Sequence, residues 1–357
     1  MFKKHTRSLA LIVAATVSGV LAAGATGRSA ADIYSVHPLV SDSSATPAAE
    51  ADGSLINGWG LSAGPTTPWW AANNGTNTST LYSGTGVKAA LTVSVAGAPT
   101  GTVFNGNAAD FVVSQNGKSG AARFLFATEG GTILGWTPAV NGTAAVVGAD
   151  RSAAGAIYKG LAVASDRLYA SDFHNRRVDV FDASFNPIST SGGFKDAKVP
   201  KGFAPFGIQA LGGNIFVTYA KQDAAAKDDV PVPGQAYVDE FTPDGQLIAS
   251  VVNSGKRNAP LNAPWGLAIA PADFSVFGGD LLVGNFGNGR ISAYTQRGSK
   301  WVYKGQLRHA DGTPIAIDGL WAIAFGNGSA AGPTNTLYFL SGPAGEKHGL
   351  YGSITAG

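Results

Sequence analysis

The sequence predicts an all-β protein, a six-bladed β-propeller, and three observations favour this fold class. The 357 residues include 49 Gly and 18 Pro, too many for a helical protein, while hydrophobic residues make up 45% and can form a core. A short apolar segment with a small residue in second place recurs six times. Beyond the first 25 residues, no segment keeps the 3.6-residue apolar period of a long helix.

The first 25 residues have the layout of a Sec-type signal peptide. Lys3, Lys4 and Arg7 precede an apolar run over residues 9–23, and small residues follow it. This run is shorter than the ~20 residues that span a bilayer, although an uncleaved membrane anchor is the alternative. We therefore expect a secreted protein, periplasmic or extracellular, with no transmembrane anchor in the mature chain. The chain contains no cysteine, so we expect it to be stable without disulfides.

Each of the six repeats predicts one blade. The copies begin between 41 and 59 residues apart. The chain after the signal averages about 55 residues per repeat, which is typical of a four-stranded blade. A second apolar segment follows each copy, and a third follows several of them. The copies are WGLSA from Trp59, TGTVF from Thr100, KGLAV from Lys159, FGIQA from Phe206, WGLAI from Trp265 and WAIAF from Trp321.

The sixth repeat supplies only three convincing strands, and this predicts how the ring closes. The segment 33–40 precedes the first copy and belongs to no complete repeat. We expect it to become the outer strand of the last blade and to tie the two ends of the chain together, because a propeller leaves no blade incomplete. Residues 26–357 are then a single propeller domain.

Composition and missing motifs exclude several classes of protein. Charged residues make up only 13%, and the net charge of +2 comes from the three basic residues of the signal, so no nucleic-acid partner is expected. Without cysteine there is no thiolate zinc site and no cysteine nucleophile. No Walker A and no H-E-x-x-H motif occurs. The G-x-S-x-G string over residues 60–64 lies in a repeated inner strand rather than at a strand-to-helix turn, which rejects a nucleophile elbow.

Large side chains start several of the inner strands. In a propeller, the inner strands begin and the second strands end at the same mouth of the central channel. Three tryptophans at these starts could stack on a sugar ring or another flat ligand, or they could pack between blades. The predicted ligand-binding residues are Trp59, Lys159, Phe206, Trp265 and Trp321.

Oxygen-rich side chains end several of the second strands. Such side chains from different blades could hold a hard cation such as Ca²⁺, although Asn and Asp at strand ends often bond their own turns. His174 is the candidate general base, or else an exposed loop histidine. An acidic insertion over residues 221–234 is expected to be a solvated loop, although its Asp223, Asp228 and Asp229 could bind a cation. The predicted metal ligands are Asn73, Glu129, Asp172, Asn285 and Asp318.

Long motifs in the chain, which include NGWGLSAG, YASDFHNRRVDVFD, NAPWGLAIAP and LLVGNFGNGRISAY, resemble an uncharacterised family of secreted bacterial proteins. Many members of that family carry a C-terminal PEP-CTERM sorting tail, which the final LYGSITAG does not resemble. More distantly, the repeats are similar to NHL-type six-bladed propellers. By architecture the chain is also similar to calcium-dependent lactonases of the gluconolactonase type, whose metal-ligand pattern Asp318-Gly319 matches and Trp265 does not.

Two functions stay open on this basis. The first is a propeller that binds a small molecule, a glycan or an envelope protein partner at the tryptophan-rich mouth. The alternative is a Ca²⁺-dependent hydrolase of the lactonase type, in which the cation polarises a carbonyl group and lowers the pKa of a bound water.

Overall fold

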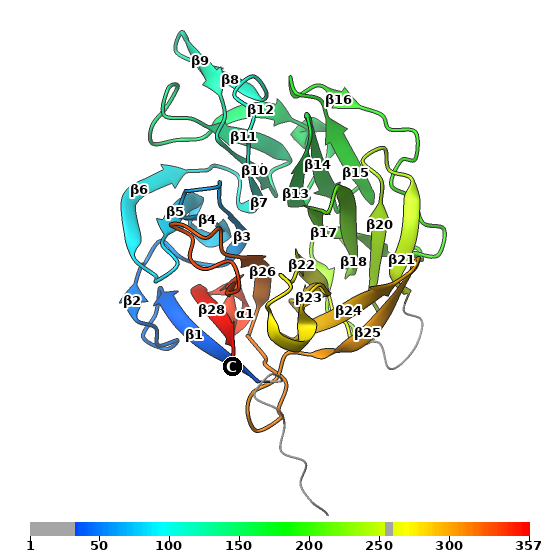
Figure 1. Cartoon of the computed structure of the whole chain (residues 1–357). Helices are drawn as coiled ribbons and strands as arrows, with labels where there is room; N and C mark the ends of the chain where they lie inside the picture. Colours follow the sequence, from blue (N-terminus) through cyan, green and yellow to red (C-terminus); the bar gives the residue numbers. More distant parts are fainter. Residues whose placement is uncertain (1–32, 254–259) are drawn as a thin grey trace, which may run out of the picture.

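Six β-sheets of four or five strands stand around a common axis, so the chain forms a six-bladed β-propeller (Figure 1). This computed structural model describes residues 33–253 and 260–357. The predicted signal peptide, residues 1–25, lies outside the described residues. Within them, no helix is long and apolar enough to cross a membrane. The predicted fold class and the number of blades are confirmed.

Each blade begins with an inner strand at the axis. Neighbouring inner strands contact one another in chain order, and the last contacts the first, so the ring is closed. The inner strands are β3 (Gly58–Ser62), β7 (Pro99–Phe104), β13 (Tyr158–Ala164), β17 (Phe203–Leu211), β22 (Pro264–Ile269) and β26 (Leu320–Phe325).

Three further strands follow outwards in each blade. The second strands are β4 (Trp69–Asn73), β10 (Phe124–Thr128), β14 (Arg167–Asp172), β18 (Asn214–Gln222), β23 (Leu281–Asn285) and β27 (Leu337–Ser341). The third are β5 (Thr78–Tyr82), β11 (Thr132–Trp136), β15 (Arg177–Phe181), β20 (Tyr237–Phe241), β24 (Ile291–Arg297) and β28 (Leu350–Ala356). The outer strands are β6 (Lys88–Ser94), β12 (Val146–Asp150), β16 (Pro187–Ile188), β21 (Leu247–Asn253), β25 (Lys300–Gln306) and β1 (Tyr34–Ser41).

Several short strands and helical turns lie outside the four main strands of each blade. The strands β8 (Val112–Gln115) and β9 (Lys118–Ala121) form a hairpin between β7 and β10. The strand β2 (Glu50–Ala51) pairs with β1, and β19 (Asp229–Val230) pairs with β18. A single four-residue α1 (Pro343–Glu346) and 3-10 turns over Asn74–Thr76, Ser152–Ala154 and Ser275–Phe277 are the helical elements of the described residues.

The first strand of the chain completes the sixth blade. β1 pairs antiparallel with β28, from Tyr34 opposite Ala356 to Ser41 opposite Leu350. Figure 1 shows β1, in blue, beside the red strand β28 at the end of the chain. The predicted closure of the ring by the N-terminal strand is confirmed.

Burial explains why the second strands are nearly continuous apolar runs. Both faces of such a strand are covered by the neighbouring blades, so FLFAT in β10 is buried at all five positions. Between the first two blades, the ring of Trp70 stacks on that of Phe124 with centroids 4.1 Å apart. Flat apolar side chains of this kind fill the wedges between adjacent sheets.

The small residue in second place of each repeat lets neighbouring inner strands approach closely. An added Cβ at Gly207 would lie 2.0 Å from the carbonyl oxygen of Trp265, and one at Gly60 would lie 2.4 Å from that of Thr100. Atoms cannot approach this closely, so glycine is required where backbones meet. In the sixth blade the corresponding residue is Ala322.

Each inner strand carries a β-bulge near its start. In the third blade, Tyr158 pairs with Asp172 and Leu161 pairs with Ala170, so two residues of β13 lie opposite one residue of β14. The same shift occurs at the same place in the other five blades. A bulge redirects the side chain at its first position. These first positions are Trp59, Thr100, Lys159, Phe206, Trp265 and Trp321.

Candidate functional site

Aromatic rings from four blades meet at the end of the axis where the inner strands begin. The rings of Trp59 and Trp321 are stacked with centroids 3.7 Å apart. Phe206 and Trp265 contact both rings edge-on, with centroids 5.8 to 6.4 Å away. Phe286, from the loop after β23, stacks on the other face of Trp321 at 4.0 Å. The rings therefore cover one another and fill this end of the axis.

These predicted ligand-binding rings are buried rather than exposed at an open mouth. Their exposed fraction is 9% or less for Trp59, Phe206, Trp265 and Trp321. Two indole N–H groups also have internal partners. Trp321 donates to Asn57 Oδ1 at 2.9 Å, and Trp265 donates to the Lys159 carbonyl oxygen at 2.8 Å. The surroundings of these rings agree with the alternative, packing between blades. A ligand role for these rings stays a prediction.

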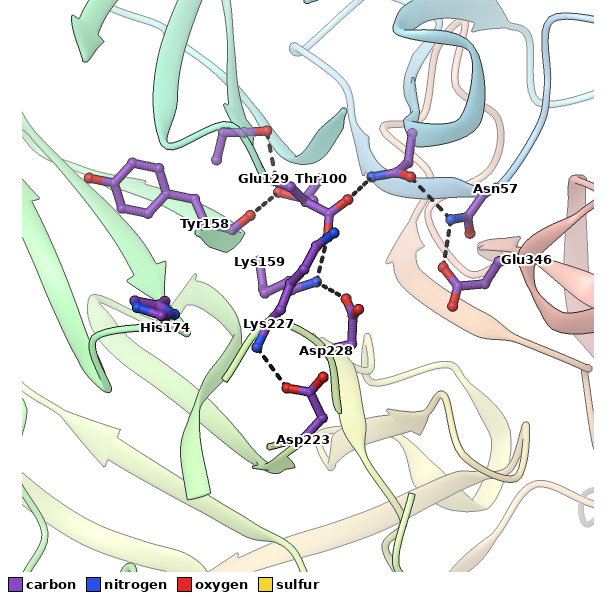
Figure 2. Close-up of polar contacts among 12 residues, drawn as sticks. Asn57, Thr100, Glu129, Tyr158, Lys159, His174, Asp223, Lys227, Asp228 and Glu346 are labelled. Carbon is purple, nitrogen blue, oxygen red and sulfur yellow. Dashed lines mark hydrogen bonds and ion pairs between the residues drawn. The ribbon is translucent and has the colours of Figure 1, made fainter. Parts of the chain in front are cut away.

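Lys159 is the one charged side chain among the six bulge residues, and it is only 2% exposed. Its Nζ lies 2.5 Å from Glu129 Oε1 and 3.1 Å from Asp228 Oδ1 (Figure 2). The same ammonium group lies 5.2 Å from the centroid of the Trp59 ring, within the range of a cation–π contact. Burial by itself lowers the pKa of Lys159, but the Glu129 and Asp228 carboxylates outweigh it and raise this pKa. The lysine therefore stays protonated.

Asp228 is carried by the acidic insertion of the fourth blade, which we call the arm, residues 221–234. Its end folds back as β19 onto β18, with Lys221 opposite Val230. The Gln222 amide donates to the Phe173 carbonyl oxygen at 2.6 Å, so the arm is also anchored on the third blade. The arm was expected to be a solvated loop, but it delivers an ion-pair partner to a buried lysine. The Asp228 side chain itself remains 59% exposed.

Two further carboxyl groups lie close enough to influence this ion pair. Burial raises the pKa of Asp229 to about 7; the nearby Glu346 and Asp228 carboxylates add to the increase, and Lys159 opposes it. Asp229 Oδ2 is buried and has no hydrogen-bond partner among the described residues. Burial also raises the pKa of Glu346, with smaller increases from Glu129 and Asp228. Two carboxylates thus contact the Lys159 ammonium group, and two further carboxyl groups lie near enough to feel its charge.

Two asparagines connect these carboxyl groups. Asn57 Nδ2 donates to Glu346 Oε2 at 2.7 Å and to Asn74 Oδ1 at 3.3 Å. Asn74 Nδ2 donates to Glu129 Oε2 at 2.9 Å, so a chain of hydrogen bonds runs from the sixth blade to the second (Figure 2). We call this network the lysine cluster, and its members are Asn57, Asn74, Glu129, Lys159, Asp228, Asp229 and Glu346.

Three of the predicted metal ligands bond their own surroundings instead. Asn73 Nδ2 donates to the hydroxyls of Thr78 and Thr80. The Asp172 carboxylate accepts from Asn175 and from the Ile157 N–H, and burial raises its pKa. Asn285 Oδ1 accepts from the Asn262 N–H at 2.8 Å. These side chains shape the turns at the ends of their strands.

Strand alternation explains why Glu129 differs from these three residues. Asn73 and Asp172 pair with the residue before the bulge in their blades, and in the second blade this position belongs to Thr128. Glu129 is one residue further along, equivalent to Asn74 and Phe173, and side chains of successive strand residues point to opposite sides. The residues selected because they end a second strand therefore include side chains that point to opposite sides.

Asp318 and His174 lie outside the lysine cluster. Asp318 is exposed, and its Oδ2 accepts from the Ala344 N–H at 2.8 Å. His174 Nδ1 lies 3.2 Å from the Ala226 carbonyl oxygen of the arm, and Figure 2 shows the ring to the side of the lysine network. A role for His174 as a general base stays a prediction.

The five predicted calcium ligands do not come together as one site. Across residues 33–253 and 260–357, no group of three or more His, Cys, Asp or Glu side chains is placed to hold a metal ion. Only Glu129 belongs to the lysine cluster, and both of its carboxylate oxygens already accept hydrogen bonds. This corrects the expected set of ligands, because four of the five side chains face their own turns or solvent.

Sequence reasoning missed three members of the lysine cluster, namely Asn57, Asn74 and Glu346, and it named Asp228 and Asp229 only as possible cation ligands of the insertion. Asn74 and Glu129 share the position just after a second strand, so a comparison of that position across the repeats would have identified both. Asn57 and Glu346 lie in loops without a repeated pattern. Only the closed ring brings the start of the first blade against the last one.

Comparisons with known proteins identify relatives by sequence and solved structures with a similar fold. No family model matches the chain. It is 31% identical over 311 residues to the uncharacterized protein L690 of Acanthamoeba polyphaga mimivirus, which covers 83% of this chain and 80% of that protein. It is 30% identical over 346 residues to the uncharacterized protein R648 of the same virus, covering 92% and 81%. These relatives are viral, so they confirm nothing about a bacterial origin or a sorting tail.

Solved structures are similar in fold at low sequence identity. The soluble aldose sugar dehydrogenase of Escherichia coli is 12% identical, with a TM-score of 0.54 over 91% of this chain and 100% of that one. A catalytically inactive virginiamycin B lyase of Staphylococcus aureus with quinupristin is 13% identical, with a TM-score of 0.50 over 90% and 98%. At these identities the likeness shows the propeller fold alone.

Proposed function

This chain belongs to the family of the uncharacterised mimivirus proteins L690 and R648, and we propose that it is a binding protein for a small ligand with a positively charged group. The ligand binds at the lysine cluster, at the end of the axis where the inner strands begin.

The imbalance of charge in the lysine cluster carries this proposal. Glu129, Asp228, Asp229 and Glu346 share a single ammonium group, and the raised pKa values of Asp229 and Glu346 show that their ionised forms are disfavoured there. A ligand cation placed among these carboxylates stabilises their ionised forms by Coulomb attraction, which is strong at a partly buried site. The partner that Asp229 Oδ2 lacks among residues 33–253 and 260–357 would then come from the ligand.

The arm gives the ligand a way in. The Asp228 side chain is more than half exposed, while the lysine that it contacts is buried, so a ligand can approach the cluster at Asp228.

Matched pairs of probes test the proposal. Putrescine and 1,4-butanediol share a carbon skeleton but carry ammonium and hydroxyl groups respectively, and glucosamine carries an ammonium group in place of one hydroxyl of glucose. We expect the charged member of each pair to raise the melting temperature and to give a calorimetric binding signal, since a ligand stabilises the state that it binds. The combined variant Asp229→Asn with Glu346→Gln should weaken binding about tenfold or more. Asp244→Asn, in an exposed ion pair with Arg167 outside the cluster, is the control. Equal signals from charged and neutral probes would refute the proposal.

Calcium is the second cation to titrate, because a Ca²⁺-dependent hydrolase was the alternative function and Glu129 lies in the cluster. A rise in melting temperature with calcium that is reversed by a chelator and absent in Glu129→Gln would favour that alternative. A response to organic cations without a response to calcium favours binding alone.

We further propose that the protein is secreted and that its first 25 residues are removed as a signal peptide. N-terminal sequencing of the exported protein tests this, and Thr26 is the expected first residue. A mature protein that still begins at Met1 would contradict it.

A further inference from the structure

The opposite end of the axis is hollow. A cavity of about 330 Å³ opens where the inner strands finish, and five of the six strands line it. A smaller cavity of about 30 Å³ lies further along the axis and shares Leu61, Thr102 and Gln209 with it. The bulge residues close the axis beyond this point. We propose that this cavity, which we call the far pocket, is a second binding site, for a small, uncharged and largely apolar molecule.

The side chains of the far pocket select against charge. Its lining includes no Asp, Glu, Lys, Arg or His. An ionised ligand would lose its hydration there without gaining a counter-charge, which is costly. Ten of the fourteen lining residues are apolar, and they include small ones such as Ala63, Ala210 and Ala324 beside the aromatic residues Trp69, Phe104 and Phe325. This composition suits an aromatic or alicyclic ring.

A few polar groups limit the ligand to one or two hydrogen bonds. The Ser62 hydroxyl, in the wall, has no hydrogen-bond partner among the described residues. The Gln209 amide is exposed at the rim and can both donate and accept. Thr102 already donates to the Leu125 carbonyl oxygen, and Asn327 donates to the carbonyl oxygens of Gly64 and Thr67. The ligand therefore carries an apolar body with a hydroxyl, carbonyl or amide group.

The volume agrees with this class of ligand. Small-molecule sites in proteins commonly enclose about 300 to 1,000 Å³ and are mostly apolar with a few polar groups. A cavity of about 330 Å³ lies at the small end of this range, with room for a molecule of one or two fused rings.

A matched pair of probes tests the inference. Naphthalenemethanol is neutral and naphthoate is its anionic analogue; a cationic analogue is left out because the lysine cluster is itself proposed to bind cations. We expect the neutral probe to bind saturably in calorimetry, and naphthoate to bind at least about tenfold more weakly. Comparable affinity for the two probes would overturn the inference.

Filling the pocket localises the binding. Ala324→Phe, at the half-buried rim, should reduce affinity for the neutral probe about tenfold or more, whereas Ala89→Phe on the outer strand β6 should not. If Ala324→Phe does not fold, Ala63→Phe fills the same pocket from β3. Unchanged affinity in a folded pocket variant would refute the site.

The far pocket does not depend on the proposed function. Glu346→Gln should leave affinity for naphthalenemethanol unchanged, because Glu346 belongs to the lysine cluster and not to the pocket lining. Loss of this binding in Glu346→Gln would overturn the separate second site.

Discussion

At one end of the axis the six inner strands begin with bulges, most of which carry large side chains, and at the other end five of the same strands line an uncharged pocket. The first end is filled by stacked rings and by Lys159 with its carboxylate partners. The second end encloses a hollow of about 330 Å³ whose lining carries no charged side chain. One set of six strands therefore builds two sites of opposite chemistry.

The difference shows that strand geometry and side-chain choice act separately. Closely packed glycines such as Gly60 and Gly207 bring the strands together along their length and so fix the width of the axis. The size of the side chains then decides whether the axis is filled or hollow at a given distance along it. Variants at the two ends should therefore have unequal effects on stability and binding.

The largest expected loss of stability follows a substitution at the end of the axis that the stacked rings fill. Trp321 is fully buried between Trp59 and Phe286, so Trp321→Ala should lower the free energy of unfolding by about 3 to 5 kcal/mol. At the open end, Phe325→Ala should cost only about 1 to 2 kcal/mol, because this ring is half-buried. Urea denaturation measures both. Similar losses would contradict the contrast between the ends.

Removing the only cation of the lysine cluster comes next. Lys159→Met leaves a buried group of carboxylates without a counter-charge and should destabilise the fold by about 3 kcal/mol or more. Arg167→Met is the control, since its ion pair with Asp244 is exposed and should contribute no more than about 1 kcal/mol. Equal effects of the two substitutions in urea denaturation would mean that burial does not strengthen the first pair.

One added methyl group tests how closely the inner strands must pack between the two ends of the axis. Gly207→Ala places a Cβ against the Trp265 carbonyl oxygen and should destabilise the fold by about 2 to 3 kcal/mol. An added Cβ at Gly53 would meet no atom within 4 Å, so Gly53→Ala should be nearly neutral. Thermal unfolding followed by circular dichroism distinguishes the two. A neutral Gly207→Ala would show that the inner strands can separate without cost.

The smallest effect depends on pH and belongs to the charged end alone. Because burial raises the pKa of folded Asp229 to about 7, the folded state holds its proton where the unfolded state has lost it. The contribution of Asp229 therefore lowers stability as pH rises from about 4 to 7, and the deficit is complete above that range. Asp229→Asn should remove this slope and raise stability near pH 8, where the parent's buried carboxyl group is ionised at a cost. A variant with the parent's pH profile would contradict it.

The repeats made most of the fold predictable. Position within each repeat correctly placed Trp59, Lys159 and Trp321 at the axis, and the unmatched N-terminal segment predicted the closing strand. The predicted metal ligands do not lie together. Glu129 points inward because of the register of β10 against β7, and this register cannot be read from one sequence. The far pocket was not predicted either, since small apolar residues give no chemical signal.

Closure of the sixth blade also sets an order of events during synthesis. β1 precedes every other strand of the described residues, its partner β28 follows them all, and the Gly357 N–H bonds the Ile33 carbonyl oxygen. While the strands between them are being synthesised, the edge of β1 that pairs with β28 is open and can aggregate. The ring therefore cannot close until β28 has been made.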